Sequence, residues 1–294
     1  MTTLHNTNTR SFYCYSQLEF EYSEQQETLW CYMNPRPRPC FNSELLNSLR
    51  SMQNTIYELD GKASPYTDDR IAYFIFASKV PGVFNLGGDL NLFQTLIKRK
   101  DRDALRAYAH ACIDVLYHNI DMPSSITTIS LVQGSALGGG FEAALSSSVL
   151  VAERSAELGL PEILFNLFPG MGAYSLLARR IGPRLAERLI TSGKIYRAEE
   201  LYEMGVVDVL AEDGHGQAAV EKYIRQHRRS RNGLQAIEKV RQFCDPLNFE
   251  ELSGIAEIWV DAACRLNSRD LRMMNKLVSA QNHLQNPATE VCAA

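Results

Sequence analysis

The sequence has little that would tie it to a membrane or a nucleic acid. No run of about 18 apolar residues, the length that spans a bilayer, occurs among its 294 residues. Its 30 Lys and Arg are outnumbered by 34 Asp and Glu, which gives a net charge of −4 at pH 7. The basic excess of nucleic-acid-binding proteins is therefore missing. We expect neither membrane insertion nor a nucleic-acid partner.

Cysteine and histidine are present, but not in the patterns that bind metals. The seven cysteines form no C-x-x-C pair, and the six histidines form no H-x-x-x-H pair. An odd number of cysteines without a framework spacing favours reduced thiols. The first residues, MTTLHNTNTRSF, contain no apolar segment of the kind found in signal peptides. We predict a cytoplasmic protein with no metal and no other cofactor.

The N-terminal part, residues 1–65, is predicted to be a β-hairpin followed by a helix. Within 12–33, apolar and acidic residues alternate with the period of a strand, and TLWCYM then reads as a second strand. Three prolines between 35 and 39 mark a loop. Ser43 is predicted to cap the helix that follows.

The central part, residues 66–213, alternates buried strands with helices, and the last part, 214–294, is predicted to be helical. Continuous apolar runs at 71–77, 126–132 and 148–153 are typical of strands covered on both faces. This order predicts an α/β fold with an N-terminal β-hairpin and a C-terminal helical extension. In the tail, one helix face is predicted to contain Ile255, Ile258, Trp259 and Ala262.

Two glycine-rich segments follow predicted strands and precede predicted helices. The first is FNLGGDL at 84–90, with a helix expected to begin near Asp89. The second is VQGSALGGGFEAAL at 132–145, with a helix expected near Phe141. Glycines at such junctions let backbone N–H groups approach a ligand closely. The first segment alone is more simply explained as a turn.

Two glutamates lie among apolar residues close to these glycines in the sequence. Glu142 stands in FEAAL, and Glu162 stands in LGLPEILFNLFPGMGA. Each is either a solvated residue at a helix start or a desolvated carboxyl with a raised pKa. Together with the glycines, they suit an oxyanion hole beside an acid/base pair.

The order FNLGGDL, GSALGGGFE, GLPEILFNLFPGMGA resembles the crotonase (enoyl-CoA hydratase/isomerase) superfamily over roughly residues 66–215. The resemblance implies a crotonase-type ββα spiral core. It also implies that the amides of Gly88 and Gly139 bind a thioester oxygen. The two carboxylates of the hydratases fall on Glu142 and Glu162. Leu86, Gly87 and Gly88 stand where many hydratases have Ala-Gly-Ala, a difference that leaves the backbone N–H in place.

A closer resemblance is to the synthases of diffusible signal factors, the cis-2-enoic acid quorum signals. It is carried by VFNLGGDLNLF, LVQGSALGGGFEAAL, LPEILFNLFPGMGAYS and EIWVDAA. It implies dehydration of a 3-hydroxyacyl chain on acyl carrier protein and hydrolysis of the thioester. It further implies a cognate sensor kinase as a partner and a homotrimer or dimer of trimers. The acyl pocket is expected to contain Leu137, Met171, Trp259 and Leu277.

Two other functions remain open at this stage. A CoA-dependent enoyl hydratase or isomerase would use the same site groups, but it would release a thioester rather than a free acid. A non-catalytic crotonase-fold protein would act only by binding, for example to RNA or a signalling kinase, but Glu142 and Glu162 are intact and the net charge is acidic. The basic cluster RQHRRSR at 225–231 is either a solvated helix end or a docking surface for acidic carrier protein.

Overall fold

The computed structural model describes residues 15–63 and 69–283. Its larger sheet has the order β1-β2-β3-β5-β7-β10, with strands Leu18–Ser23, Thr28–Met33, Tyr73–Ser78, Thr127–Val132, Val149–Glu153 and Val209–Ala211. The smaller sheet has the order β4-β6-β8-β9, with strands Val83–Asn85, Ser135–Leu137, Glu157–Gly159 and Ile195–Arg197. Strands β1 and β9 run antiparallel to their neighbours, and the other pairs are parallel.

From β3 to β8, successive strands alternate between the two sheets, so this part of the chain winds as a spiral. Each of the pairs β3/β4, β5/β6 and β7/β8 places one strand in the larger sheet and the next in the smaller sheet. The helices are α1 Ser43–Glu58, α2 Leu90–Arg99, α3 Arg102–Ile120, α4 Gly139–Leu145, α5 Ala173–Ile181, α6 Pro183–Ser192, α7 Ala198–Glu203, α8 Gly216–His227, α9 Arg231–Cys244, α10 Phe249–Cys264 and α11 Ser268–His283. Short 3-10 turns are η2 Glu24–Gln26, η3 Pro161–Phe165 and η4 Arg228–Ser230.

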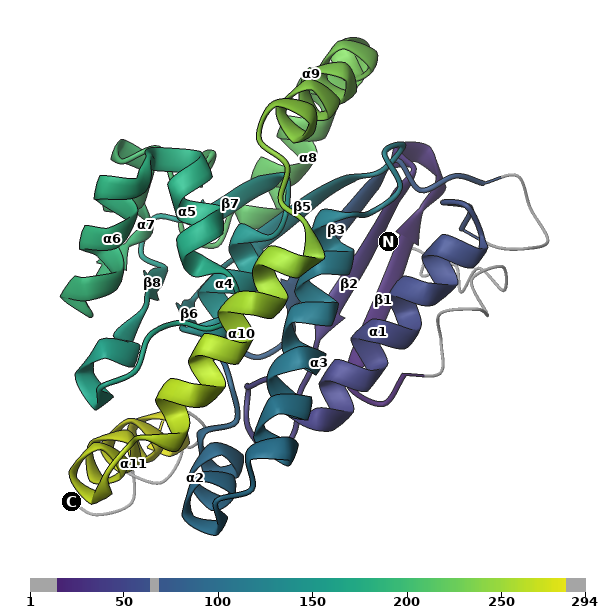
Figure 1. Cartoon of the computed structure of the whole chain (residues 1–294). Coiled ribbons are helices and arrows are strands. Elements are labelled where there is room, and N and C mark those ends of the chain that lie inside the picture. Colours follow the sequence, from purple (N-terminus) through teal and green to yellow (C-terminus); the bar gives the residue numbers. More distant parts are fainter. Residues whose placement is uncertain (1–14, 64–68, 284–294) are drawn as a thin grey trace, which may run out of the picture.

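Both faces of the larger sheet are covered, which explains the apolar runs in its strands. On one side, α1, α3 and α10 lie next to one another (Figure 1) and contribute to one large core. On the other side, Val220 and Ile224 of α8 pack on Tyr73, Ile75 and neighbouring side chains. The predicted α/β class with a hairpin and a helical tail is confirmed. The three-part division stays a prediction, since the large core draws residues from all three parts.

The N-terminal hairpin is formed by β1 and β2, and the part of the predicted range before residue 15 lies outside the described residues. The predicted cap of the first helix was wrong by one position. Asn42, not Ser43, is the N-cap, and its side chain accepts a hydrogen bond from the Leu45 amide. Asn and Ser are both good caps, so residue type alone did not separate the two neighbours.

The predicted buried face of the tail helix was also wrong in part. In α10 the buried residues are Leu252, Ala256, Trp259, Val260 and Ala263, whereas Ile258 is 60% exposed. This helix is apolar over much of its circumference, so periodicity did not single out one face. Only Trp259 of the predicted set is buried.

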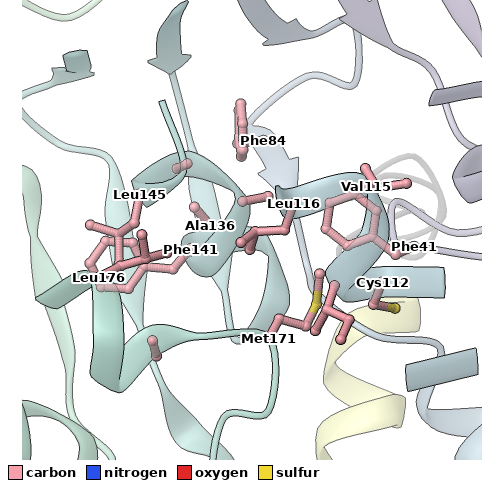
Figure 2. Close-up of a cluster of buried hydrophobic side chains, with 14 of the residues drawn as sticks. Phe41, Phe84, Cys112, Val115, Leu116, Ala136, Phe141, Leu145, Met171 and Leu176 are labelled. Carbon is pink, nitrogen blue, oxygen red and sulfur yellow. The ribbon is translucent and has the colours of Figure 1, made fainter. Parts of the chain in front are cut away.

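Helix α4, which carries Glu142, is held closely against strand β4. A Cβ on Gly140 would lie 2.0 Å from the carbonyl oxygen of Asn85. The other faces of α4 are packed with apolar side chains: Figure 2 shows Phe141 and Leu145 beside Leu176 of α5. The position of Glu142 therefore depends on a backbone contact that only glycine permits.

We predict that Gly140→Ala destabilises the protein by about 1–3 kcal/mol, because the new methyl group must displace a backbone carbonyl. The matched control is Gly233→Ala on exposed α9, where a Cβ meets nothing within 4 Å. That variant should gain about 0.5–1 kcal/mol from helix propensity. Urea unfolding of both variants measures the difference. Equal stability of the two would contradict the close contact at Gly140.

Candidate active site

The two glycine segments meet at one end of the smaller sheet. They follow β4 and β6, which are parallel neighbours, so their carboxyl ends lie side by side. A Cβ on Gly139 would lie 3.6 Å from the Gly88 nitrogen, and one on Gly87 would lie 2.9 Å from the Gly139 nitrogen. The expected oxyanion amides, those of Gly88 and Gly139, are thus neighbours in space. Among the described residues, neither amide has an acceptor.

The first junction is fixed by hydrogen bonds around it. The Gly87 amide donates to the Asn85 side chain over 2.8 Å, and the Gly87 carbonyl accepts from the Phe41 amide over 2.8 Å. Helix α2 begins next to Asp89, as the sequence predicted, and Asp89 caps it by accepting from two amides of its first turn. Tyr108 of α3 accepts from the Asp89 amide over 3.1 Å and donates to the Phe41 carbonyl. The Gly88 amide is therefore presented from a rigid turn.

Glu142 is buried, with 1% of its surface exposed, and one of its oxygens is held by the backbone. Its Oε1 accepts from the Met171 amide over 2.8 Å and from the Ala173 amide over 2.9 Å. Gly172, between these donors, has a φ of +107° and lets both amides point at one atom. Burial raises the pKa of Glu142, and the two backbone hydrogen bonds oppose that rise in part.

Glu162 approaches the same place from η3. A Cβ on Gly138 would lie 2.4 Å from Glu162 Oε1, so the carboxyl rests against the second glycine junction. Its Oε2 is buried and has no hydrogen-bond partner among the described residues. Burial raises the pKa of Glu162, and the charge of Glu142 raises it further. Of the two carboxyls, Glu142 is the better stabilised as an anion, which favours the proton on Glu162.

Both glutamates and both glycines line one cavity of about 280 Å³. Leu137, Met171 and Trp259, which were expected in an acyl pocket, line it too. Leu277 belongs to α11, but its side chain lies outside the described ones. The remaining lining residues are Leu86, Leu90, Phe93, Tyr108, Ala109, Cys112, Ser135, Gly138, Glu157, Pro161, Phe165, Leu167, Gly170 and Ile195.

Helix α10 contributes Trp259 to the cavity wall, where the Trp259 side chain contacts the segment that follows η3. A Cβ on Gly170 would come within 2.4 Å of the Trp259 ring, and this ring also contacts Phe93 with centroids 5.0 Å apart. Deeper in, Met171 lies near Cys112 and Leu116 of α3 (Figure 2). Tyr108 and Cys112 were predicted only as residues of a buried helix face. Their spacing marks burial, and nothing in it distinguishes a core wall from a cavity wall.

The arrangement suits a carbonyl compound with a long apolar chain. Two neighbouring amides can stabilise negative charge on the carbonyl oxygen, and two carboxyls with raised pKa values can exchange protons near neutral pH.

Within residues 15–63 and 69–283, no group of three His, Cys, Asp or Glu is arranged to hold a metal. No helix in the described part of the chain is long and apolar enough to cross a membrane.

Known proteins with similar structures include enoyl-CoA hydratase from Bacillus halodurans, with a TM-score of 0.74 and 20% identity over 89% of this chain and 100% of that chain. DspI from Pseudomonas aeruginosa has a TM-score of 0.65 and 24% identity over 88% of this chain and 98% of that chain. At these identities, the likeness concerns the fold. It confirms the predicted crotonase fold.

Curated relatives include the probable mitochondrial enoyl-CoA hydratase 2 of Arabidopsis thaliana, 28% identical over 72% of this chain and 64% of that protein. Mitochondrial methylglutaconyl-CoA hydratase of Mus musculus is 32% identical over 53% of this chain and 48% of that protein. The fatty acid oxidation complex subunit alpha of Idiomarina loihiensis is 36% identical over 50% of this chain. The chain spans only 20% to 64% of the length of these relatives.

The enoyl-CoA hydratase/isomerase family model matches residues 46–248, a range that contains both glycine junctions and both glutamates. This match covers more than half of the chain. The chain therefore belongs to the enoyl-CoA hydratase/isomerase family, the crotonase superfamily.

Proposed function

We propose that this protein makes a cis-2-unsaturated fatty acid signal by dehydrating a 3-hydroxyacyl chain on acyl carrier protein and then hydrolysing the thioester. The observation that carries the proposal is the single apolar cavity that contains Glu142, Glu162 and the amides of Gly88 and Gly139. The choice of a synthase within the family rests on the motif resemblance.

Dehydration removes the C2 proton and the C3 hydroxyl. The Gly88 and Gly139 amides stabilise the enolate oxygen at C1, which acidifies the C2 proton. We assign the C2 proton to Glu162 and the departing hydroxyl, which leaves as water, to Glu142. This direction needs Glu162 ionised and Glu142 protonated, whereas the resting site favours the opposite distribution. One proton must therefore pass between the two carboxyls when substrate binds.

Hydrolysis uses the same site. A carboxylate takes a proton from water, the oxygen attacks C1, and the tetrahedral oxyanion forms at the two amides. The C–S bond then breaks, and the departing thiolate of the carrier receives the proton of Glu162. The resting site supplies an ionised Glu142 for the first of these steps. Because water is the only co-reactant, the sequence of two steps needs no group beyond those in the cavity.

The second candidate is a CoA-dependent enoyl hydratase or isomerase, which the family match favours. In the hydration direction, an ionised Glu142 would activate water and a protonated Glu162 would protonate C2, which is the resting distribution. The two functions differ in their product: a hydratase releases a thioester and a synthase a free acid. A purely binding role is disfavoured because both carboxyls reach one cavity.

The remaining partners are part of the same proposal. We propose a carrier-bound substrate, assembly with further copies of this chain as a trimer or dimer of trimers, and contact with a sensor kinase. Helix α9 offers uncovered apolar surface, since Ile237, Val240 and Phe243 are 64%, 60% and 87% exposed. Figure 1 shows α9 projecting from the body of the molecule.

Glu142→Gln should lower the rate of dehydration by about two or more orders of magnitude, because the amide cannot exchange a proton. Its side-chain oxygen can still accept from the Met171 and Ala173 amides, so the fold should persist. The loss of the enoyl product is followed with a 3-hydroxyacyl thioester, and circular dichroism checks folding. A folded variant with near-normal activity would remove Glu142 from the mechanism.

The rate of dehydration should follow a bell-shaped curve against pH. At low pH both carboxyls are protonated and no base remains; at high pH both are ionised and no acid remains. Because the pKa of each carboxyl is raised, the whole bell should lie above the range of two ordinary glutamates. The measurement is kcat/KM from pH 4 upward. A rate that is already maximal where ordinary glutamates titrate, and stays flat above it, would contradict the buried pair.

Purified protein given 3-hydroxydodecanoyl carrier protein should release free dodecenoic acid, mainly the cis-2 isomer, as identified by mass spectrometry and chromatography against standards. Glu162→Gln should impair this dehydration and also the hydrolysis of preformed cis-2-dodecenoyl carrier protein, because the two steps share one site. A wild type that stops at the enoyl thioester would identify a hydratase. A variant that loses dehydration but keeps full hydrolysis would refute the shared use of Glu162 and would leave the water to Glu142 alone or to a separate site.

A further inference from the structure

Six cations lie on two neighbouring helices beside the cavity. Helix α2 contributes Leu90 and Phe93 to the cavity wall, and its chain ends in the run Lys98-Arg99-Lys100. Helix α11 packs against both α2 and η3, the turn that carries Glu162. We call the following residues the mouth patch: Lys98, Arg99, Lys100, Arg269, Arg272 and Lys276.

The mouth patch is exposed, and the acid next to it in the sequence, Asp101, caps α3 rather than pairing with Lys100. All six side chains are exposed, and none forms an ion pair with another described residue. On α11 the three cations are spaced i, i+3 and i+7, so they share one face. The one acid among them in the sequence, Asp270, is buried on another face and accepts from the Asn267 amide. In a chain with a net charge of −4, this concentration of cations is a local feature.

We propose that the mouth patch docks an acidic acyl carrier protein, so that the thioester on its flexible arm enters the cavity between α2 and η3. This inference rests on the proposed function and deepens it. Charges at the edge of an interface steer an oppositely charged partner and fix its register. The patch spreads over the outer surfaces of two helices. Such a spread suits the face of a protein better than a compact group of phosphates, which is bound by converging side chains.

The basic cluster at 225–231 is a poorer docking surface, although the sequence made it the first candidate. Arg228 and Arg231 are used within the molecule: they donate to the carbonyls of Gln25 and Ser125, and Arg225 pairs with Glu221. The cluster joins α8 to α9 at the end of the molecule away from α2 and α11 (Figure 1). A carrier bound there would be far from the cavity.

The helix dipole gives a competing explanation for part of the patch. Cations in the last turn of α2 stabilise its carboxyl end whether or not a partner binds. That effect would change stability and leave substrate selection unaltered. It also does not apply to Arg269 and Arg272, which lie in the first turns of α11, where the dipole disfavours positive charge. Recognition of a partner accounts for both helices.

The test compares two charge reversals in the patch with a matched reversal elsewhere. The patch variants are Lys98→Glu/Arg99→Glu and Arg269→Glu/Arg272→Glu. The control is Lys222→Glu/Arg229→Glu, which makes the same change in net charge on exposed residues of α8 and η4. Each protein is given the same 3-hydroxydodecanoyl chain on carrier protein, on CoA and on pantetheine.

Each patch variant should raise KM for the carrier substrate by roughly tenfold or more, since charge reversal turns attraction into repulsion, and should leave kcat unchanged. KM for the pantetheine thioester should stay as in the wild type, and the control should behave as wild type throughout. Added salt should weaken wild-type binding of the carrier and reduce the difference. An unchanged KM for the carrier, an equal effect in the control, or an effect as large on CoA or pantetheine would overturn the docking site.

Failure of the proposed function would be seen separately. If the wild type converts CoA thioesters but not carrier thioesters, the synthase is refuted. Docking is then decided by titrating unacylated holo-carrier protein into each variant and measuring Kd. Binding to wild type and control that weakens in both patch variants supports the patch, whereas no saturable binding to wild type overturns it.

Discussion

The rest of the structure depends on the burial of two carboxyls in one apolar cavity. Taking an ionised carboxylate out of water is costly unless hydrogen bonds replace the lost solvation. Glu142 obtains two such bonds from the Met171 and Ala173 amides, while Oε2 of Glu162 obtains none from the described residues. This inequality favours the negative charge on Glu142 and the proton on Glu162. A pair with equal environments would not divide acid and base roles at rest.

Glycines at the two junctions bring the backbone amides and the side chains of the site together. A Cβ on Gly87 would meet the backbone of the other junction at 2.7 Å. A Cβ on Gly88, Gly138 or Gly139 would meet a side chain at 2.4–2.6 Å, namely that of Phe93, Glu162 or Met171. The amides of Gly88 and Gly139 thus have positions that the ends of the strands and helices determine. This explains how a thioester oxygen can reach two N–H groups at once. It also links folding to function, because whatever loosens α4 against β4 moves Glu142 as well.

The sequence predicted the parts of the site that have strong local signals. Two patterns can be recognised from the sequence alone: glycines between a strand and a helix, and glutamates among apolar residues. The structure places the four groups predicted from them, Gly88, Gly139, Glu142 and Glu162, at one cavity. The amides that hold Glu142 could not be predicted, since every residue has one. The buried face of α10 was predicted wrongly because this helix has apolar residues over much of its circumference. Tyr108 and Cys112 were not predicted to line the cavity because their spacing is that of any helix face buried in a core. The mouth patch depends on the contact of α11 with α2, two helices that lie roughly 170 to 190 residues apart in the chain.

The central claim is that a thioester carbonyl lies between the Gly88 and Gly139 amides with its C2 and C3 atoms against the two glutamates. A crystal structure of the Glu162→Gln variant with 3-hydroxydodecanoyl pantetheine tests it most directly. The account predicts the carbonyl oxygen within hydrogen-bond distance of both amides, the hydroxyl beside Glu142 and the chain running toward Met171 and Trp259. A carbonyl that points away from both glycines, with the acyl chain outside this cavity, would contradict it.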